Sequence, residues 1–105
     1  MSGYSRFGLL LPLRFNDGGA APKALLPGTA IEIERRFRAA SWESRVIEGI
    51  WHHAGIEFRD QLNRLFVDAE DTPENRRFFI QLKQRCKARF QQLDIWLTVH
   101  PIEVL

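Results

Sequence analysis

The chain has 105 residues, of which 45% are hydrophobic and 27% charged, and its formal net charge is +2. This length suits one domain with a core of its own and excludes two. The composition excludes a disordered chain, and the small net charge does not by itself require a polyanionic partner.

The chain contains a single cysteine, Cys86, which excludes a disulfide within the chain and fits a reducing compartment. The apolar run Leu9–Leu13 is too short to span a membrane, and no small-residue cleavage pattern follows it. We therefore expect a cytoplasmic protein.

Apolar residues alternate in the first part of the chain and predict a strand over residues 7–15. Pro12 lacks a backbone N–H and indicates a bulge, or a position facing away from the neighbouring strand. Turn residues follow, and Pro27-Gly28 interrupts any long helix. The first main helix is expected to begin after Thr29, because Thr29 and Glu32 have the spacing of a capping box.

Two further strands are predicted over residues 42–51 and 56–68, joined by a turn at His52–Gly55. In the second of them the phase of the apolar residues changes between Phe58 and Leu65. A β-bulge near residues 59–61 would explain this change, and so would a change of partner along the strand.

The clearest helix start lies at Asp71–Glu74, where an N-cap residue is followed by proline at the first helical position and an acid in the first turn. This helix is expected to continue to about Gln92. Its apolar stripe consists of Phe79, Leu82, Cys86, Phe90 and Leu93. A last strand is predicted over residues 94–99, with Pro101 ending its regular pairing.

The order of elements is β-α-β-β-α-β, which is the pattern of a ferredoxin-like domain. We therefore expect one α+β domain over residues 1–105. Its antiparallel sheet would have four strands in the order 4-1-3-2, with both helices on one face.

The C-terminal part of the chain carries a family resemblance. The segments Thr72-Pro73-Glu74-Asn75, Phe78-Phe79, Lys83 and Arg89-Phe90-Gln91-Gln92, followed by an apolar strand, resemble small bacterial ferredoxin-like proteins of uncharacterised function. The resemblance implies the fold and a tendency to self-associate. It implies no catalytic residue.

The helix-free face of such a sheet is expected to carry many large apolar side chains, which usually mark an interface. Its expected residues are Leu10, Pro12, Arg14, Trp96, Thr98 and His100, with Ile47 and Trp51. A second copy, the chain's own loop at residues 16–29 or its apolar tail, or a small molecule could cover this face. We favour a homodimer, and hence an interaction or accessory module. In a ligand-binding protein or enzyme, the pocket would be lined by Arg14, Arg64, Trp96 and His100.

The second helix is basic, since residues 75–93 contain six cations and no acid. A nucleic-acid backbone could bind such a surface through Arg76, Lys83 and Lys87. The alternative, which we favour, is a solvated helix face whose last cations suit the C-terminal end of the helix dipole.

The sequence contains no catalytic or cofactor signature. His52 and His53 lie near Glu57, but a structural metal site needs four fixed donors at a recognisable spacing. Cys86 belongs to the apolar stripe and is expected in the core. Gly18-Gly19 lacks the helix and lysine of a phosphate-binding loop. We therefore expect neither a metal nor a cofactor, and no class of enzyme is indicated.

Overall fold

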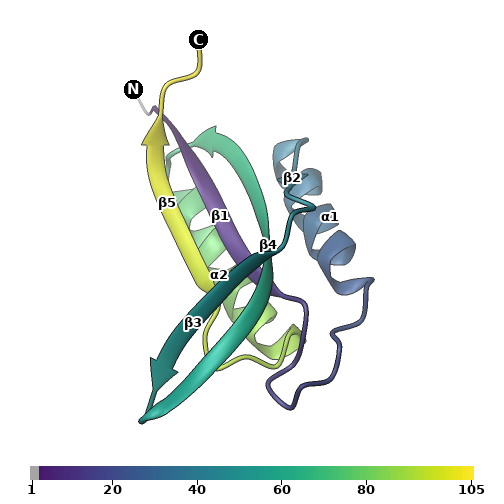
Figure 1. Cartoon of the computed structure of the whole chain (residues 1–105). Coiled ribbons are helices and arrows are strands. Elements are labelled where there is room, and N and C mark those ends of the chain that lie inside the picture. The colour runs from purple at the N-terminus through teal and green to yellow at the C-terminus, as the bar shows by residue number, and fades with distance from the viewer. Residues whose placement is uncertain (1–2) are drawn as a thin grey trace.

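The structure is a computed structural model, and it describes residues 3–105. Within these described residues, two helices and five strands follow one another, arranged as in Figure 1. In order they are β1 (Tyr4–Pro12), α1 (Leu25–Phe37), β2 (Ser41–Trp42), β3 (Ile47–His53), β4 (Ile56–Glu70), α2 (Pro73–Arg89) and β5 (Trp96–Ile102).

The core is built on β1, which pairs antiparallel with β4 on one side and with β5 on the other. The odd-numbered residues Phe7, Leu9 and Leu11 are fully buried, because the pleat turns every second side chain of β1 toward the helices. On β4 the neighbouring residues Leu65 and Val67 face the same way.

Both helices cover this face of the sheet. Ile33 of α1 and Phe79, Leu82 and Cys86 of α2 share one buried cluster with the odd-numbered residues of β1. The rings of Phe7 and Phe79 stack with their centroids 4.6 Å apart. The sequence therefore predicted the α+β class, the two helices and the antiparallel sheet correctly.

The number of strands differs from the expectation, because the sheet has five strands and not four. The segment predicted as one strand over residues 42–51 consists of β2 and β3, both of which pair with β4. Residues 43–46 between them belong to no strand. The Glu43 N–H still donates to the Arg64 carbonyl oxygen at 3.0 Å, and the side-chain amide of the half-buried Asn63 donates to the carbonyl oxygen of Glu43, also at 3.0 Å.

The strand β4 has two halves with different partners. Residues 62–70 pair with β1, whereas residues 56–62 pair with β3, and both registers run without interruption. No bulge is needed, and the change of partner explains the phase change between Phe58 and Leu65. Residues 47–53 and 56–61 extend beyond β1 and β5 as a two-stranded projection, which we call the overhanging ribbon (Figure 1).

The overhanging ribbon closes in a two-residue turn at Ala54 and Gly55, with φ angles of 51° and 78°. Two positive φ angles are those of a type I′ turn, which matches the twist of the flanking strands. The turn is thus shorter than the predicted His52–Gly55. His52 and His53 are the last residues of β3, and successive strand residues point to opposite faces.

The helix starts illustrate one wrong and one correct prediction. In α1, which begins at Leu25, Thr29 is not a cap: it is buried and its hydroxyl donates to the Leu25 carbonyl oxygen at 2.8 Å. Pro27 lies in the first turn of α1, where backbone N–H groups have no hydrogen-bond partner within the helix. The missing N–H of Pro27 is therefore tolerated. In α2, Thr72 is the N-cap, as predicted, and its hydroxyl accepts from the Asn75 N–H at 3.1 Å.

Several strand and helix ends also lie elsewhere than expected. The helix α2 ends at Arg89, and Leu93 is exposed rather than part of the buried stripe. The first strand begins at Tyr4 and ends at Pro12, and the last continues through Pro101, which lies opposite Ser5. Because β5 is an edge strand, the missing N–H of Pro101 is tolerated there.

Candidate functional site: the open face and the edges of the sheet

The helix-free side of the sheet, which we call the open face, carries even-numbered residues from the three strands β4, β1 and β5. The pairing registers arrange them in three rows across the strands. The rows are Arg64–Leu10–Trp96, Phe66–Gly8–Thr98 and Asp68–Arg6–His100. The large apolar side chains of Leu10, Phe66 and Trp96 therefore share one surface with Arg6 and Arg64.

Arg6 and Asp68 form the polar centre of the open face. The guanidinium of Arg6 donates two hydrogen bonds to the Asp68 carboxylate, at 2.8 and 3.0 Å, and its Cζ lies 4.5 Å from the centroid of the Phe66 ring. The hydrogen bond from Arg6 holds the pKa of Asp68 below its ordinary value. The predicted first strand began at Phe7 and so did not include Arg6, although opposite charges on paired strands are a usual signal.

Three of the four predicted ligand-binding residues lie on the open face, but they are spread over it. Arg64 and Trp96 flank Leu10 in one row, and Arg64 is paired with Glu43 at 3.5 Å. Trp96 is 65% exposed. His100 lies four residues further along β5, which corresponds to about 13 Å. Since Trp96, Thr98 and His100 are all exposed, neither the loop nor the apolar tail of this chain covers β5.

The fourth predicted residue, Arg14, lies apart from the other three. It belongs to a loop in which it pairs with Ala20, and its guanidinium reaches the Gly18 carbonyl oxygen at 3.4 Å. Arg14 lines a cavity of about 510 Å³ between this loop and residues 57–61 of the overhanging ribbon. The structure therefore does not gather the four predicted residues in one pocket.

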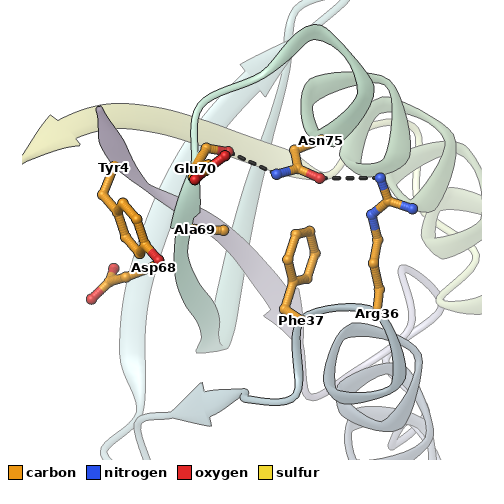
Figure 2. A pocket seen from close by; sticks show the side chains of 7 residues that line it. All are labelled: Tyr4, Arg36, Phe37, Asp68, Ala69, Glu70 and Asn75. Atoms are coloured by element: carbon orange, nitrogen blue, oxygen red, sulfur yellow. Dashed lines mark hydrogen bonds between the residues drawn. The ribbon is translucent and has the colours of Figure 1, made fainter. Parts of the chain in front are cut away.

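A second cavity, of about 400 Å³, lies at the end of β4 beside the helices, and we call it the edge pocket (Figure 2). Its lining residues are Tyr4, Arg36, Phe37, Asp68, Ala69, Glu70 and Asn75. Figure 2 shows the amide of Asn75 between Glu70 and Arg36: it donates to the Glu70 carbonyl oxygen at 2.8 Å and accepts from Arg36 at 3.1 Å. Sequence reasoning missed this pocket because its walls come from four separate elements.

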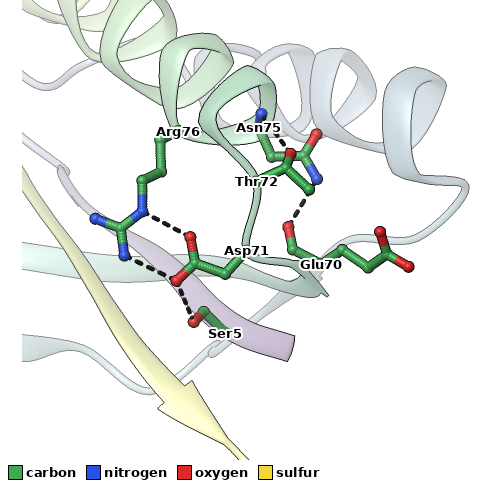
Figure 3. Close-up of polar contacts among 6 residues, drawn as sticks. All are labelled: Ser5, Glu70, Asp71, Thr72, Asn75 and Arg76. Atoms are coloured by element: carbon green, nitrogen blue, oxygen red, sulfur yellow. Dashed lines mark hydrogen bonds and ion pairs between the residues drawn. The ribbon is translucent and has the colours of Figure 1, made fainter. Parts of the chain in front are cut away.

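Behind the edge pocket, Asp71 ties the start of α2 to β1 (Figure 3). Its carboxylate accepts two hydrogen bonds from Arg76, at 2.6 and 2.8 Å, and one from the Ser5 hydroxyl at 2.7 Å. These donors lower the pKa of Asp71 to about 2. Arg76, one of the three predicted nucleic-acid contacts, is thus already paired with Asp71 of the same chain.

The remaining cations of α2 are also largely paired. Lys83 contacts Asp94 at 3.1 Å, and Arg85 and Arg89 contact Glu32 of α1 at 3.2 and 2.6 Å. Lys87 has no ion pair among the residues that the structure describes. Four of the six cations of the basic helix therefore already have anionic partners.

The remaining candidates offer little for metal or thiol chemistry. Within residues 3–105 no three His, Cys, Asp or Glu side chains are placed to hold a metal ion. Cys86 is fully buried, and this burial raises the pKa of its thiol to about 11, which disfavours the reactive thiolate. Neither helix in the described part of the chain is long and apolar enough to cross a membrane.

Comparisons with known proteins identify the fold. The chain matches no protein-family model and no curated protein sequence. Its structure is similar to that of a phage SAM lyase in complex with S-methyl-5′-thioadenosine, with a TM-score of 0.72 and 14% identity over 96% of this chain and 83% of that chain. It is also similar to the divalent cation tolerance protein CutA1 from Thermus thermophilus, with a TM-score of 0.63 and 19% identity over 94% and 84% of the two chains. The likeness shows the fold alone.

Proposed function

We propose that this chain is a small interaction module whose copies associate through their open faces. The apolar residues of the open face carry the proposal, above all the exposed Trp96 beside the half-buried Leu10. Tyr4 at the end of β1 adds a second aromatic side chain, 46% exposed. Large apolar surfaces on a small domain are costly in water and favour association.

The overall dimensions support this proposal. The accessible surface is 7030 Å², whereas a compact monomer of this mass exposes about 6,000 Å². The radius of gyration is 14.1 Å, compared with about 13 Å for a compact domain of this length.

A cytoplasmic location is part of the same proposal. It is supported by the single free cysteine, which is buried among apolar side chains.

The test of the interface is sedimentation velocity on the wild type and on Trp96→Asp. We expect a concentration-dependent dimer that is weakened about 100-fold by the substitution, because a central buried tryptophan commonly contributes more than 2 kcal/mol to binding. Trp42→Asp is the matched control, since Trp42 is 55% exposed and lies opposite Leu65 on the helix side of the sheet. A wild type that stays monomeric at millimolar concentration, or equal weakening by both substitutions, would refute the proposal.

A second candidate function is the binding of a nucleoside-like ligand at the open face. It is favoured by one observation, that a protein of this fold was found with S-methyl-5′-thioadenosine. Trp96 offers a surface for stacking a base, and Arg64 and His100 offer polar groups on the same face, while Arg14 would serve the separate loop cavity. Titration with S-methyl-5′-thioadenosine should quench tryptophan fluorescence saturably, and Trp96→Phe should abolish this signal while Trp42→Phe preserves it. No saturable quenching in the wild type would exclude this candidate.

A further inference from the structure

The edge pocket lies on a stretch of β4 that has no neighbouring strand on its outer side. On that side β3 covers residues 56–62 and β2 covers only Leu65 and Phe66. Within the described part of the chain, residues 67–70 are therefore paired on the β1 side alone. An uncovered strand edge is a template for pairing with another extended segment.

The backbone groups of even-numbered residues at this edge point to the outer side of β4, away from β1. The carbonyl oxygen of Arg64 accepts from the Glu43 N–H, and that of Glu70 accepts from the Asn75 side chain, both on the outer side of β4. Backbone groups of a strand alternate between its two sides, so those of Asp68 lie on the outer side as well. The N–H and carbonyl of Asp68 and the N–H of Glu70 are thus available to an added strand.

The wall of the edge pocket is formed by the end of α1 (Figure 2). The guanidinium of Arg36 is held by the Asn75 side chain at 3.1 Å, and its Cζ lies 5.5 Å from the ring centroid of Phe37 and 5.0 Å from that of Phe78. A fixed cation therefore stands next to an aromatic ring, above a strand edge. Such a wall suits an extended segment that carries an acid and an apolar residue on one face.

Residues 103–105, Glu-Val-Leu, form such a segment, which we call the tail. It continues beyond β5 away from the body of the molecule (Figure 1), with Val104 65% exposed and Leu105 fully exposed. In an extended conformation Glu103 and Leu105 lie on the same face, about 7 Å apart, and Val104 lies on the other. Glu103 and Leu105 would match Arg36 and Phe37 in charge and polarity.

The tail cannot fill the edge pocket of its own chain. The order of strands is β4-β1-β5, so the outer side of β4 is three strand spacings, or about 14 Å, from β5. The three residues of the tail span only about 10 Å. An occupant with this sequence must therefore come from a second copy.

We propose that the tail of one copy adds as a strand to residues 67–70 of β4 in another copy, with Glu103 at Arg36 and Leu105 at Phe37. The two copies then share a site to which each contributes different residues. This contact is separate from association through the open face, and either can exist without the other.

Disulfide trapping between two variants tests the proposal. An epitope-tagged Val104→Cys protein is mixed with an untagged Glu70→Cys protein under mild oxidation, because the added strand would place these two side chains side by side on one face. The control partner is Glu57→Cys, which makes the same change on the same strand, away from the edge pocket. Native Cys86 is buried and does not compete.

We expect the mixed disulfide to form on the order of tenfold faster with Glu70→Cys than with Glu57→Cys, because docking raises the effective concentration of the two thiols. Adding Arg36→Glu to the Glu70→Cys protein should remove the difference, and Arg35→Glu should not. Equal rates with Glu70→Cys and Glu57→Cys would overturn the proposal.

The same trapping in a Trp96→Asp background separates the two contacts. A preserved tenfold difference shows that the tail docks independently of the open face, whatever happens to the dimer seen in sedimentation. A difference that disappears in this background, while circular dichroism shows folded protein, overturns docking of the tail as a separate contact.

Discussion

The two halves of β4 lie in different environments although they form one uninterrupted strand. Residues 62–70 have β1 beside them and the helices above them, and Leu65, Val67 and Ala69 are buried. Residues 56–61 have only β3 as a strand partner, and none of their side chains is fully buried. The ladder of backbone hydrogen bonds therefore extends further than the hydrophobic core.

This difference shows what holds the overhanging ribbon in place. A two-stranded hairpin alone is marginally stable in water. Here the rings of Trp51 and Phe58 stack with centroids 4.4 Å apart, and the Trp51 indole donates to the Asp60 carboxylate at 2.5 Å. A stacked aromatic pair and a few polar side-chain contacts, among them the ion pair between Arg59 and Glu57, thus take the place of a core.

The comparison predicts that the core half is far more sensitive to truncation. Phe79→Ala removes a fully buried ring that stacks on Phe7, and we expect it to lower the free energy of unfolding by about 3–5 kcal/mol. Urea unfolding followed by circular dichroism measures this loss. Ile80→Ala, on the exposed side of the same helix, should change stability by less than about 0.5 kcal/mol. Similar losses for the two variants would contradict the assignment of the core.

Truncation in the ribbon should have a smaller and local effect. Phe58→Ala removes the stacking partner of Trp51, which we expect to cost about 1 kcal/mol. The loss should appear as faster amide exchange at residues 47–61 with unchanged exchange in β1, because the ribbon can open without the core. Ile56→Ala, an exposed position on the same strand, is the control. Uniformly faster exchange in both regions would show that the two halves open together.

The sequence predicted the core half better than the ribbon for a physical reason. In the core, burial requires strict alternation, so Phe7, Leu9 and Leu11 predict a strand and Leu82 and Cys86 predict a helix face. In the ribbon, apolar residues lie on both faces without being buried, and Ile50 and Ile56 are both exposed. The spacing of apolar residues therefore does not show which face of the ribbon is covered. For the same reason, the phase change in the sequence of β4 was compatible with a bulge and with a change of partner.

The candidate site was predictable only in part. Alternation along β5 correctly predicted that Trp96 and His100 lie on the open face, because every second residue of a regular strand points to the same side. Arg14 lies beyond the end of β1 at Pro12, where the alternation no longer applies. The edge pocket depends on where β2 begins: pairing with β4 starts only at Ser41, opposite Phe66, which leaves residues 67–70 without a strand on their outer side.

The smallest expected effect lies at the junction between α2 and β1, at Asp71, directly after residues 62–70 of β4. Asp71 has its pKa lowered to about 2 by hydrogen bonds from Arg76 and Ser5, below the ordinary value of 3.8. A carboxyl group whose pKa is lower in the folded state stabilises the protein above its unfolded pKa, and this contribution is lost as the pH falls from about 4 to about 2. Asp71→Asn should therefore be less stable than the wild type at pH 7, and the two proteins should converge near pH 2.

Thermal unfolding at intervals between pH 7 and pH 2 measures this convergence. The pKa values of Asp68 and Asp94 are also lowered, so the wild type keeps part of its acid sensitivity in the Asp71→Asn variant. Glu48→Gln, which changes an exposed acid of the overhanging ribbon, is the control and should run parallel to the wild type at every pH. A constant difference between Asp71→Asn and the wild type across the whole range would mean that the carboxylate of Asp71 acts through its shape and hydrogen bonds, and not through its charge.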